Sequence, residues 1–474
     1  MTQRPLTLVL GAGPAGLAAA LELARAGRAP IVLEAERAVG GLARTLRRGG
    51  FSFDLGGHRW LTKNDEVNEL VHTLLGDELI PVDRSSQILF RGRRYRYPIR
   101  ITDVLRNAGP RLTLAALLAY VAARCRVALR GATPRNMAEA FIAQFGSHLY
   151  EMFFANYSAK VWGRDCTRMS ADWVAQRTRG MSLLTTVLHA LRLRRRRTVS
   201  LAESFHYPRR GFGRISERLA EEVTASRGSI RLAHRVEAAA WEGRRIVSVL
   251  ACDGEGERHS FPVGDIVSTI PLERLVAMLR PEAPPQVIAA CGALEYRDLI
   301  TVNLMLKRSR LTCQNWVYVH DRELPYARFH EPCNWSPEMA PPGCSSVVVE
   351  YFCSRGDELW SKPDEVLVQE TVASFERDLG LLAREDLLDG FVVRLPRAYP
   401  LYGLGYRKTR RTLLDFLDRF ENLELAGRGG TFRYDNSDHA IEAGLLAARN
   451  ILGALHDIDA VNRSPEYLEE RRCD

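Results

Sequence analysis

The segment Val9–Gly16, with the sequence VLGAGPAG, constrains the fold of this chain more than any other. The apolar residues Leu6–Leu10 are predicted to form a short buried strand, and Leu17–Ala26, rich in alanine and leucine, a helix. A glycine-rich turn between them brings free backbone N–H groups together with the positive end of the helix dipole. The segment therefore predicts an anion-binding turn, with a purely structural turn as the alternative.

Three glycines and one acid define what this turn would bind. Gly11 permits the tight turn, Gly13 allows the backbone to approach a pyrophosphate, and Gly16 lets helix and strand pack closely. Glu34 ends a second apolar run about twenty residues further on and can bond both hydroxyls of a ribose. Strand, turn, helix and acid in this order predict a dinucleotide-binding domain.

The size and composition of the chain indicate a globular protein of more than one domain. It has 474 residues, of which 46% are hydrophobic and 26% charged. The fingerprint strand begins almost at the first residue, so we expect no secretory signal. The apolar run Leu112–Val127 is interrupted by Arg124 and Arg126, so we expect a buried helix there and no integral membrane segment.

Cysteine usage and charge indicate the compartment and the partners. The nine cysteines include no CxxC pair, which favours reduced thiols, no metal site and a cytoplasmic location. The net charge of +9 includes the block Arg192–Arg197, which could contact anionic lipid, nucleic acid or a phosphorylated substrate, or could be a solvated loop. No aromatic residue interrupts this block, so we expect no specific binding of nucleic acid.

The order of predicted elements indicates an α/β nucleotide-binding domain that is discontinuous in sequence. Alternating or apolar runs at 230–236, 238–241, 246–252 and 265–271 are predicted strands, and those at 299–307, 316–320 and 346–352 suggest a separate sheet. The predicted domains are a nucleotide-binding unit formed by 1–85, 205–275 and 391–458, an inserted substrate domain with a helical part 86–204 and a sheet part 276–390, and a tail 459–474.

Two further glycine motifs carry a family resemblance. The turn Gly40–Thr45 and the segment Phe53–His58 resemble the flavin-binding amine-oxidase superfamily over nearly the whole chain. In that superfamily the glycine doublet wraps the pyrophosphate, and a C-terminal turn, here Gly427–Gly430, leads to a helix aimed at the flavin ring. The resemblance implies FAD in a Rossmann-like domain of the glutathione-reductase type, with an inserted helical and antiparallel-sheet substrate domain. NAD(P)H is left open as an external reductant.

Within the superfamily the chain is most similar to the UDP-galactopyranose mutases. The similarity rests on short blocks in a conserved order: Gly56–His58, Tyr97-Pro98, Lys160–Trp162 with Ala175–Arg177, Trp316–Tyr318 with Arg328 and Asn334–Pro337, and Ala398–Pro400 with Gly427–His439. In those enzymes the N5 atom of the reduced flavin attacks the sugar while the nucleotide leaves, with no net redox change. The resemblance therefore implies a nucleotide sugar as the substrate.

The resemblance also implies roles for individual residues. Cofactor contacts are implied for Gly11, Gly13, Pro14, Ala15, Gly16, Glu34, Ala35, Gly41, Leu42, Arg44, Gly57, His58, Val236, Gly427, Arg428, Tyr434, Asn436, Asp438 and His439. Substrate contacts are implied for Tyr97, Arg100, Trp162, Arg177, Tyr318, Arg328 and Arg428. Catalytic roles are implied for His58, Arg177, Tyr318, Arg328, Tyr399 and Tyr434, with the arginines as phosphate clamps and the tyrosines as hydroxyl donors.

Some positions leave alternatives open. Arg100 replaces a residue that helps to bind uracil in the mutases, so another base or a phosphate is equally compatible, and the middle block Gly211–Arg214 is nearer to oxidases and desaturases. Trp162 could be a core residue or stack on a base, and His439 could cap a helix or contact the flavin. The alternative functions are an FAD oxidoreductase that dehydrogenates a sugar, amine or polyprenyl substrate, or a scaffold without chemistry. A homodimer is also left open.

Overall fold

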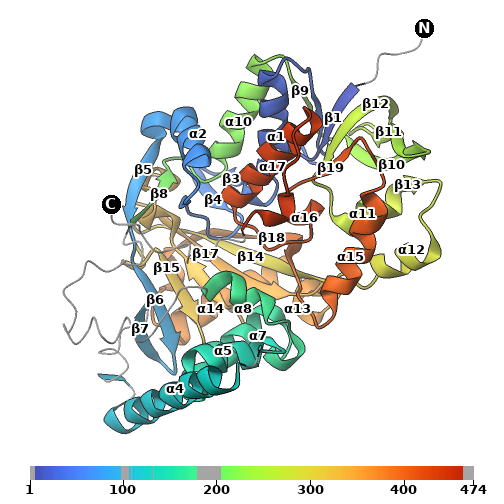
Figure 1. Ribbon diagram of the computed structural model, residues 1–474. Helices are drawn as coiled ribbons and strands as arrows, with labels where there is room; N and C mark the ends of the chain where they lie inside the picture. Colours follow the sequence, from blue (N-terminus) through green and yellow to red (C-terminus); the bar gives the residue numbers. More distant parts are fainter. Residues whose placement is uncertain (1–5, 98–105, 108, 132, 179–203, 463–474) are drawn as a thin grey trace.

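Five parallel strands form the centre of the nucleotide-binding domain in the computed structural model, which describes residues 6–97, 106–107, 109–131, 133–178 and 204–462. Their order across the sheet is β9-β2-β1-β12-β19, and all of these strands except β2 are labelled in Figure 1. The bounds are β1 Leu6–Leu10, β2 Ile31–Leu33, β9 Ser229–Arg231, β12 Arg258–Ser268 and β19 Leu423–Leu425. The predicted Rossmann-like fold is thus confirmed, with its strands drawn from three distant parts of the chain.

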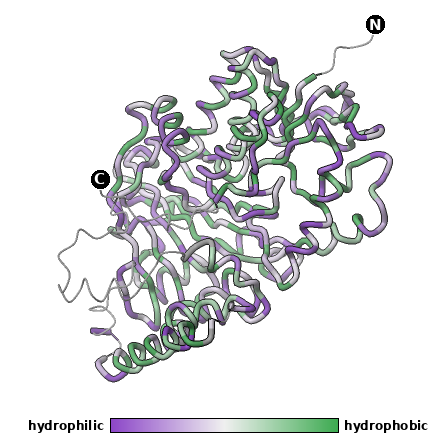
Figure 2. Tube along the Cα trace, in the orientation of Figure 1, coloured by the Kyte–Doolittle hydropathy of each residue, from purple (hydrophilic) through white to green (hydrophobic). Residues whose placement is uncertain are grey.

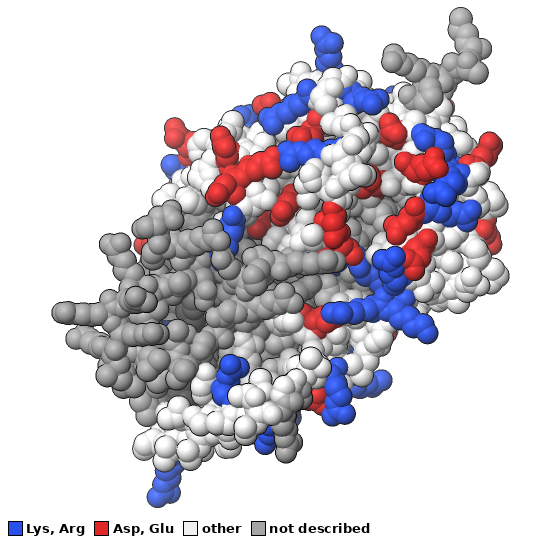
Figure 3. Space-filling view, viewed as in Figure 1, with Lys and Arg blue, Asp and Glu red and all other residues white. Residues whose placement is uncertain are grey.

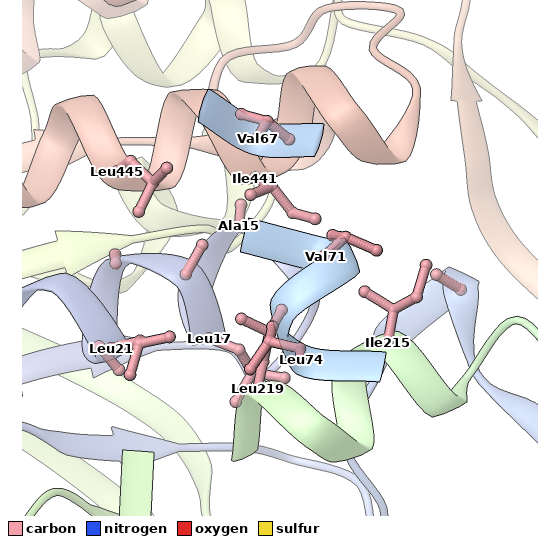
Figure 4. Close-up of a cluster of buried hydrophobic side chains, with 14 of the residues drawn as sticks. Ala15, Leu17, Leu21, Val67, Val71, Leu74, Ile215, Leu219, Ile441 and Leu445 are labelled. Carbon is pink, nitrogen blue, oxygen red and sulfur yellow. The ribbon is translucent and has the colours of Figure 1, made fainter. Parts of the chain in front are cut away.

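Four helices cover one face of this sheet. They are α1 Pro14–Arg25, α2 Asp65–Leu75, α10 Arg214–Ala225 and α17 Ser437–Ile451. Figure 4 shows their apolar side chains meeting in one core, with Leu17 of α1 beside Leu74 of α2 and Leu219 of α10. Helix α1 begins three residues before its predicted start because Pro14, which needs no N–H partner, occupies the first turn.

The other face is covered by an antiparallel ribbon and three short helices. These elements are β10 Arg235–Glu242, β11 Arg245–Cys252, β13 Leu279–Arg280, α11 Leu272–Met278, α12 Pro285–Cys291 and α15 Tyr406–Leu417. The predicted strands at 230–236 and 238–241 are wrong in their division. The first runs from β9 across a turn into β10, and β10 continues through both Val236 and Ala238. A β-bulge between these two residues shifts the register and breaks the alternation on which the prediction relied.

A second, mostly antiparallel sheet forms the inserted domain, in the order β18-β14-β17-β16-β15-β6-β7. The bounds are β6 Ser86–Phe90, β7 Arg93–Tyr97, β14 Tyr296–Leu306, β15 Trp316–Val319, β16 Arg328–His330, β17 Ser345–Cys353 and β18 Leu387–Pro400. Helix α14, Asp364–Arg377, packs on one face of this sheet. The hairpin β6–β7 and all of β18 belong to it, although 86–97 and 391–400 were predicted for the helical part and the nucleotide-binding unit.

Smaller elements complete the two domains. They are the hairpin β3 Thr45–Arg48 and β4 Phe51–Asp54, the pair β5 Leu79–Asp83 and β8 Ser204–Pro208, the turns η1 Gly41–Ala43, η2 Gly76–Glu78, η5 Pro332–Asn334, η6 Pro337–Met339, η7 Arg384–Asp386 and η8 Ile458–Ala460, and the helices α13 Glu358–Ser361 and α16 Gly427–Gly430.

The helical part of the inserted domain lies below the second sheet in Figure 1. Its elements are α4 Pro110–Arg130, α5 Met137–Phe145, α6 Ser147–Leu149, η3 Tyr150–Ala155, α7 Asn156–Trp162, η4 Cys166–Arg168 and α8 Asp172–Thr178. Among the described residues, α4 is the one helix long and apolar enough to cross a membrane, yet only 17% of its apolar window is buried. The expectation of a buried helix at Leu112–Val127 is therefore wrong, because apolarity alone does not tell whether protein covers a helix face.

Candidate active site

The first glycine turn lies at the carboxyl end of β1, and each of its glycines has a distinct environment. Gly11 has a φ of +100°, and a Cβ there would lie 2.3 Å from Oγ1 of Thr269. Gly16 packs against the turn, since a Cβ there would lie 1.9 Å from the carbonyl oxygen of Gly11. At Gly13, the N-cap of α1, a Cβ would meet no atom within 4 Å. The turn thus leaves open space where a pyrophosphate would meet the helix N-terminus.

The second glycine turn packs directly on the first. The N–H of Gly40 donates to the carbonyl of Ala12 at 2.7 Å, and a Cβ on Gly41 would lie 3.4 Å from Cα of Gly13. The Nε group of Arg44 is buried beside this turn and has no acceptor among the described residues. A buried guanidinium donor without an acceptor fits an anionic ligand, so these residues fit the pyrophosphate of FAD.

Glu34 lies at the end of β2, where the ribose of FAD is expected. Its side chain is nearly buried and accepts the N–H of Ala12 at 2.7 Å and that of Glu36 at 2.9 Å. Each carboxylate oxygen can accept a further hydrogen bond, so both can still receive a ribose hydroxyl. Other residues predicted to contact the cofactor at this end come from nearby elements: Pro14 and Ala15 from α1, Ala35 from the turn after β2, Leu42 from η1 and Val236 from β10.

The C-terminal glycine turn closes the predicted FAD site from the other side. Gly427 has a φ of +74°, and a Cβ there would lie 2.8 Å from Cβ of Ala15. The following helix, α17, begins with a capping box in which Asn436 and His439 each accept a backbone N–H of the other. His439 is thus a helix cap, and Asp438 beside it is buried. The turn therefore lies beside the N-terminus of α1, and so does the middle of α17, where a Cβ on Gly444 would lie 2.1 Å from the carbonyl oxygen of Ala15.

His58 lies in a loop that contacts both domains. The N–H of Gly57 donates to Oε1 of Glu350 at 3.2 Å, and a Cβ on Gly57 would strike the ring of Trp316 at 2.7 Å. The His58 ring stacks on Phe212 with centroids 5.0 Å apart. Burial lowers the pKa of His58 below its usual value and Arg428 adds to that effect, although the nearby Asp54 opposes it. His58 is therefore neutral at pH 7. Its Nδ1 group donates to the carbonyl oxygen of Gly56 at 3.0 Å, so Nε2 is left as a hydrogen-bond acceptor.

A buried ion pair forms the centre of the predicted substrate site. The Nε group of Arg328 donates to Oε2 of Glu350 at 2.7 Å, and its Nη2 group donates to the hydroxyl of Tyr399 at 2.9 Å. Burial would raise the pKa of Glu350, but Arg328 and His330 more than offset this and lower it to about 2. Glu350 thus holds both Arg328 and the His58 loop, and it stays charged at neutral pH.

The predicted tyrosines gather around this ion pair. The rings of Tyr399 and Tyr434 stack at 5.5 Å and 15°, and Tyr318 stacks on Trp316 at 5.7 Å and 8°. The ring of Tyr97, at the end of β7, lies 5.1 Å from that of Tyr318. All four half-buried tyrosines therefore belong to one aromatic wall that connects β7, β15, β18 and the C-terminal turn.

Arg428 contacts this aromatic wall and bonds the backbone next to it. Its Nε and Nη2 groups donate to the carbonyl of Asp435 at 3.0 and 2.6 Å, and Nη1 donates to that of Ala398 at 2.9 Å. The guanidinium lies 5.1 Å from the ring centre of Tyr399 and 5.2 Å from that of Tyr434. Two of its five N–H groups remain for a ligand, so its role as a phosphate clamp stays a prediction.

The other predicted substrate residues have different outcomes. Trp162 is only 3% exposed and packs against Trp173 and the two stacked tyrosines, which favours a core role over stacking on a base. Arg177 belongs to α8 by its backbone, and its side chain lies outside what is described. Arg100 and the block Arg192–Arg197 lie outside the described residues.

Three residues of this region were given no role from the sequence. Glu350 is the lone carboxylate of the buried strand β17, and a charge in an apolar strand is a signal that could have identified it. Tyr157 stacks on His320 at 4.5 Å and borders Tyr318, but nothing in its helix distinguishes it. Nζ of Lys160 has three N–H donors and lies 2.6 to 3.2 Å from four backbone carbonyl oxygens, so it fixes the loop after β15.

His320 makes stability depend on pH. Burial, with a further contribution from Lys160, lowers its pKa to about 3. The unfolded chain takes up this proton below pH 6.5 and the folded chain does not, so the free energy of unfolding should fall as pH drops from 6.5 towards 3. His320→Phe should flatten the fall by up to about 1.4 kcal/mol per pH unit in urea unfolding. The exposed His456, changed to Asn, is the control, and equal slopes for all three proteins would contradict this account.

One cluster with metal-ligand chemistry lies away from this site. Ligand atoms of His234, Asp253 and His259 lie within 4.8 Å of one another. Nε2 of His259 lies 2.8 Å from the Asp253 carboxylate, which also accepts the N–H groups of Glu255 and Glu257 and so holds the hairpin between β11 and β12. The hydrogen bond from His259 is the main cause that lowers the pKa of Asp253 to about 2. These bonds account for the cluster without an ion.

The fold and the paired glycine turns define a flavin-dependent enzyme. The family model described as "Flavin containing amine oxidoreductase" matches residues 14–452, and the chain belongs to this family. FAD is its cofactor, as the glycine motifs predicted.

Solved structures share the fold over almost the whole chain. A crystal structure of reduced UDP-galactopyranose mutase is 23% identical with a TM-score of 0.82, covering 98% of this chain and 99% of that one. A putative protoporphyrinogen oxidase from Exiguobacterium sp. 255-15 is 18% identical with a TM-score of 0.70, covering 98% and 100%. A putrescine oxidase mutant is 17% identical with a TM-score of 0.64, covering 94% and 98%. At these identities the likeness shows the fold alone.

Proposed function

We propose that this enzyme is a mutase-like flavoenzyme that rearranges a nucleotide-activated sugar. The observation that carries the proposal is the charge balance of the site. Arg328 and Arg428 lie around the same tyrosines. Glu350 pairs with Arg328, whereas Arg428 contacts only backbone carbonyls and tyrosine rings, which are neutral. The remaining positive charge favours an anionic group such as a diphosphate, because a buried charge needs a partner.

Each side chain then has a definite part in the reaction. Arg328 would hold the diphosphate and stabilise its negative charge as it leaves, while Glu350 keeps the guanidinium in place. Tyr97, Tyr318, Tyr399 and Tyr434 would donate neutral hydrogen bonds to the phosphates. Reduced FAD, when bound, would supply the nucleophile toward the sugar, with no net oxidation. His58, neutral at pH 7, would lie beside the flavin ring.

An amine oxidoreductase is the competing function, since the family description includes that chemistry. A cationic amine substrate would bind favourably over an aromatic face. Here the guanidinium of Arg428 already lies over the rings of both Tyr399 and Tyr434. A second cation in the same place would be repelled, so this arrangement favours an anionic substrate over an amine.

The expected setting of the reaction follows from the same proposal. A nucleotide sugar and a reduced flavin are both available in the cytoplasm, where NAD(P)H could supply the electrons. The eight cysteines among the described residues are all free, which agrees with a reducing compartment. A homodimer remains compatible with this proposal.

Ligand binding tests the proposal before any turnover is measured. Titration calorimetry of the FAD-bound enzyme should give micromolar affinity for at least one nucleoside diphosphate, falling as salt rises. Primary amines and the matching nucleosides without phosphate should bind much more weakly. Arg328→Lys should weaken the binding of the nucleoside diphosphate. The control is Arg410→Lys, because Arg410 bonds Asp459 and the carbonyl of Thr431 instead. Tight binding of an amine with no binding of diphosphates would overturn the proposal.

A further inference from the structure

Helix α4 carries an apolar stripe that no described part of the chain covers. Of the twelve large hydrophobic side chains that are exposed in the described residues, five belong to this helix, with exposed fractions from 45% to 85%. They are Leu114, Leu117, Leu118, Val121 and Leu129. At about 100° per residue these positions fall on one side of the helix, so they form a continuous stripe. Figure 2 shows this helix as a mostly green segment at the lower edge of the molecule.

The opposite side of α4 is fixed to the protein. Ala116, Tyr120 and Ala123 are buried, and α4 packs along α5 and α6. The contact is close, because a Cβ on Gly146 would lie 2.7 Å from the backbone nitrogen of Tyr120. A helix held along one side in this way can lie on a membrane surface, but it cannot span a bilayer without leaving its own domain.

The charges of α4 follow the borders of the stripe. Arg124 and Arg126 are exposed and, at about 100° per residue, fall on opposite borders of the apolar stripe. Arg111 is exposed near the start of the helix, and no Asp or Glu occurs from Pro110 to Arg130. Figure 3 shows blue side chains around the white lower edge of the molecule. An apolar face with a basic rim is the pattern of a helix that lies in the headgroup region of an anionic bilayer.

We propose that α4 is a membrane-surface anchor that binds the enzyme to bilayers with anionic headgroups. The leucines of the stripe enter the boundary between headgroups and acyl chains, and the arginines pair with lipid phosphates. A second copy of the chain fits this face less well. Two α4 stripes packed together would bring their arginine rims into contact, with no acidic residue on either helix to pair them.

Vesicle flotation of the full-length FAD-bound enzyme tests the proposal. The enzyme should float with vesicles of phosphatidylcholine and phosphatidylglycerol, and much less with phosphatidylcholine alone. Leu114→Ser with Leu118→Ser should lower the partition coefficient about tenfold for each leucine. Leu388→Ser with Leu404→Ser removes two leucines exposed elsewhere and should leave it unchanged. Arg124→Gln with Arg126→Gln should weaken binding to the anionic vesicles only and reduce its dependence on salt.

Two further readouts make the outcome decisive. The flavin absorbance of each variant shows that it is folded, and Leu118→Trp should show a blue-shifted emission with anionic vesicles if α4 enters the interface. No flotation with the anionic vesicles would overturn the proposal, as would equal losses in the two leucine pairs. A third result would assign the stripe to a second copy of the chain instead. In that case the enzyme would not bind vesicles, and it would form a dimer that dissociates in the Leu114→Ser, Leu118→Ser variant.

Discussion

Arg328→Lys is expected to lower turnover about a hundredfold or more while the enzyme keeps its fold and its FAD. The guanidinium of Arg328 contacts Glu350 and Tyr399 at once, and in the proposed reaction its remaining donors would hold the substrate diphosphate. A lysine ammonium is a single point charge, so it can neutralise Glu350 but cannot also orient the hydroxyl and a phosphate. Losing one aligned donor to a developing negative charge costs about 10²- to 10³-fold in rate.

The matching alanine variant separates stability from chemistry. Arg328→Ala leaves Glu350 buried without its cation, so the free energy of unfolding should fall by about 3–5 kcal/mol in addition to the loss of turnover. Arg328→Met with Glu350→Met should regain most of this stability and remain inactive. Urea unfolding measures the effect on stability, and steady-state rates measure the effect on turnover. Near-wild-type turnover of Arg328→Lys would contradict the role of Arg328 as a phosphate clamp.

Gly13→Val is expected to abolish FAD binding and leave the apoprotein folded. The backbone of Gly13 is extended, with a φ of −76°, and a Cβ there would meet no atom of the protein within 4 Å. A valine at this position is therefore compatible with the fold, but its side chain fills the space where the pyrophosphate approaches the backbone. We expect FAD affinity to fall at least about a hundredfold, and with it about 2.7 kcal/mol of the stabilisation that saturating FAD provides.

Gly16→Val, one helical turn further on, is the matched comparison. Its Cβ would lie 1.9 Å from the carbonyl oxygen of Gly11, so strand β1 and helix α1 would have to separate. The apoprotein itself should then lose about 3 kcal/mol or more. Thermal unfolding with and without FAD distinguishes the two variants, and normal FAD affinity of Gly13→Val would contradict the placement of the pyrophosphate.

The sequence predicts the cofactor, FAD, because the signals that point to it are local. Gly11, Gly13 and Gly16 lie within six residues, and their spacing alone indicates that each position needs a glycine. The arginines and tyrosines of the substrate side were found through a family resemblance, since their contacts come from distant strands. Arg328 meets Tyr399 across the second sheet, and no periodicity in either strand indicates that meeting.

Other features depend on tertiary packing that a single sequence does not encode. The partner that makes Glu350 tolerable in β17 is Arg328 of the neighbouring strand β16. The bulge in β10 interrupts the alternation that identifies strands. Whether the apolar run of α4 is buried or exposed depends on which of its sides meets α5, and hydropathy has the same value in both cases.

Turnover as a function of flavin redox state tests the central claim most directly. The enzyme, with FAD either oxidised or chemically reduced, is incubated without oxygen against a panel of nucleotide sugars, while products and the flavin spectrum are followed together. We predict that one nucleotide sugar is converted to an isomer of the same mass over many turnovers, only with reduced FAD, and that the flavin stays reduced. Stoichiometric bleaching of oxidised FAD by a sugar, amine or polyprenyl substrate, with an oxidised product, would contradict this account and establish an oxidoreductase.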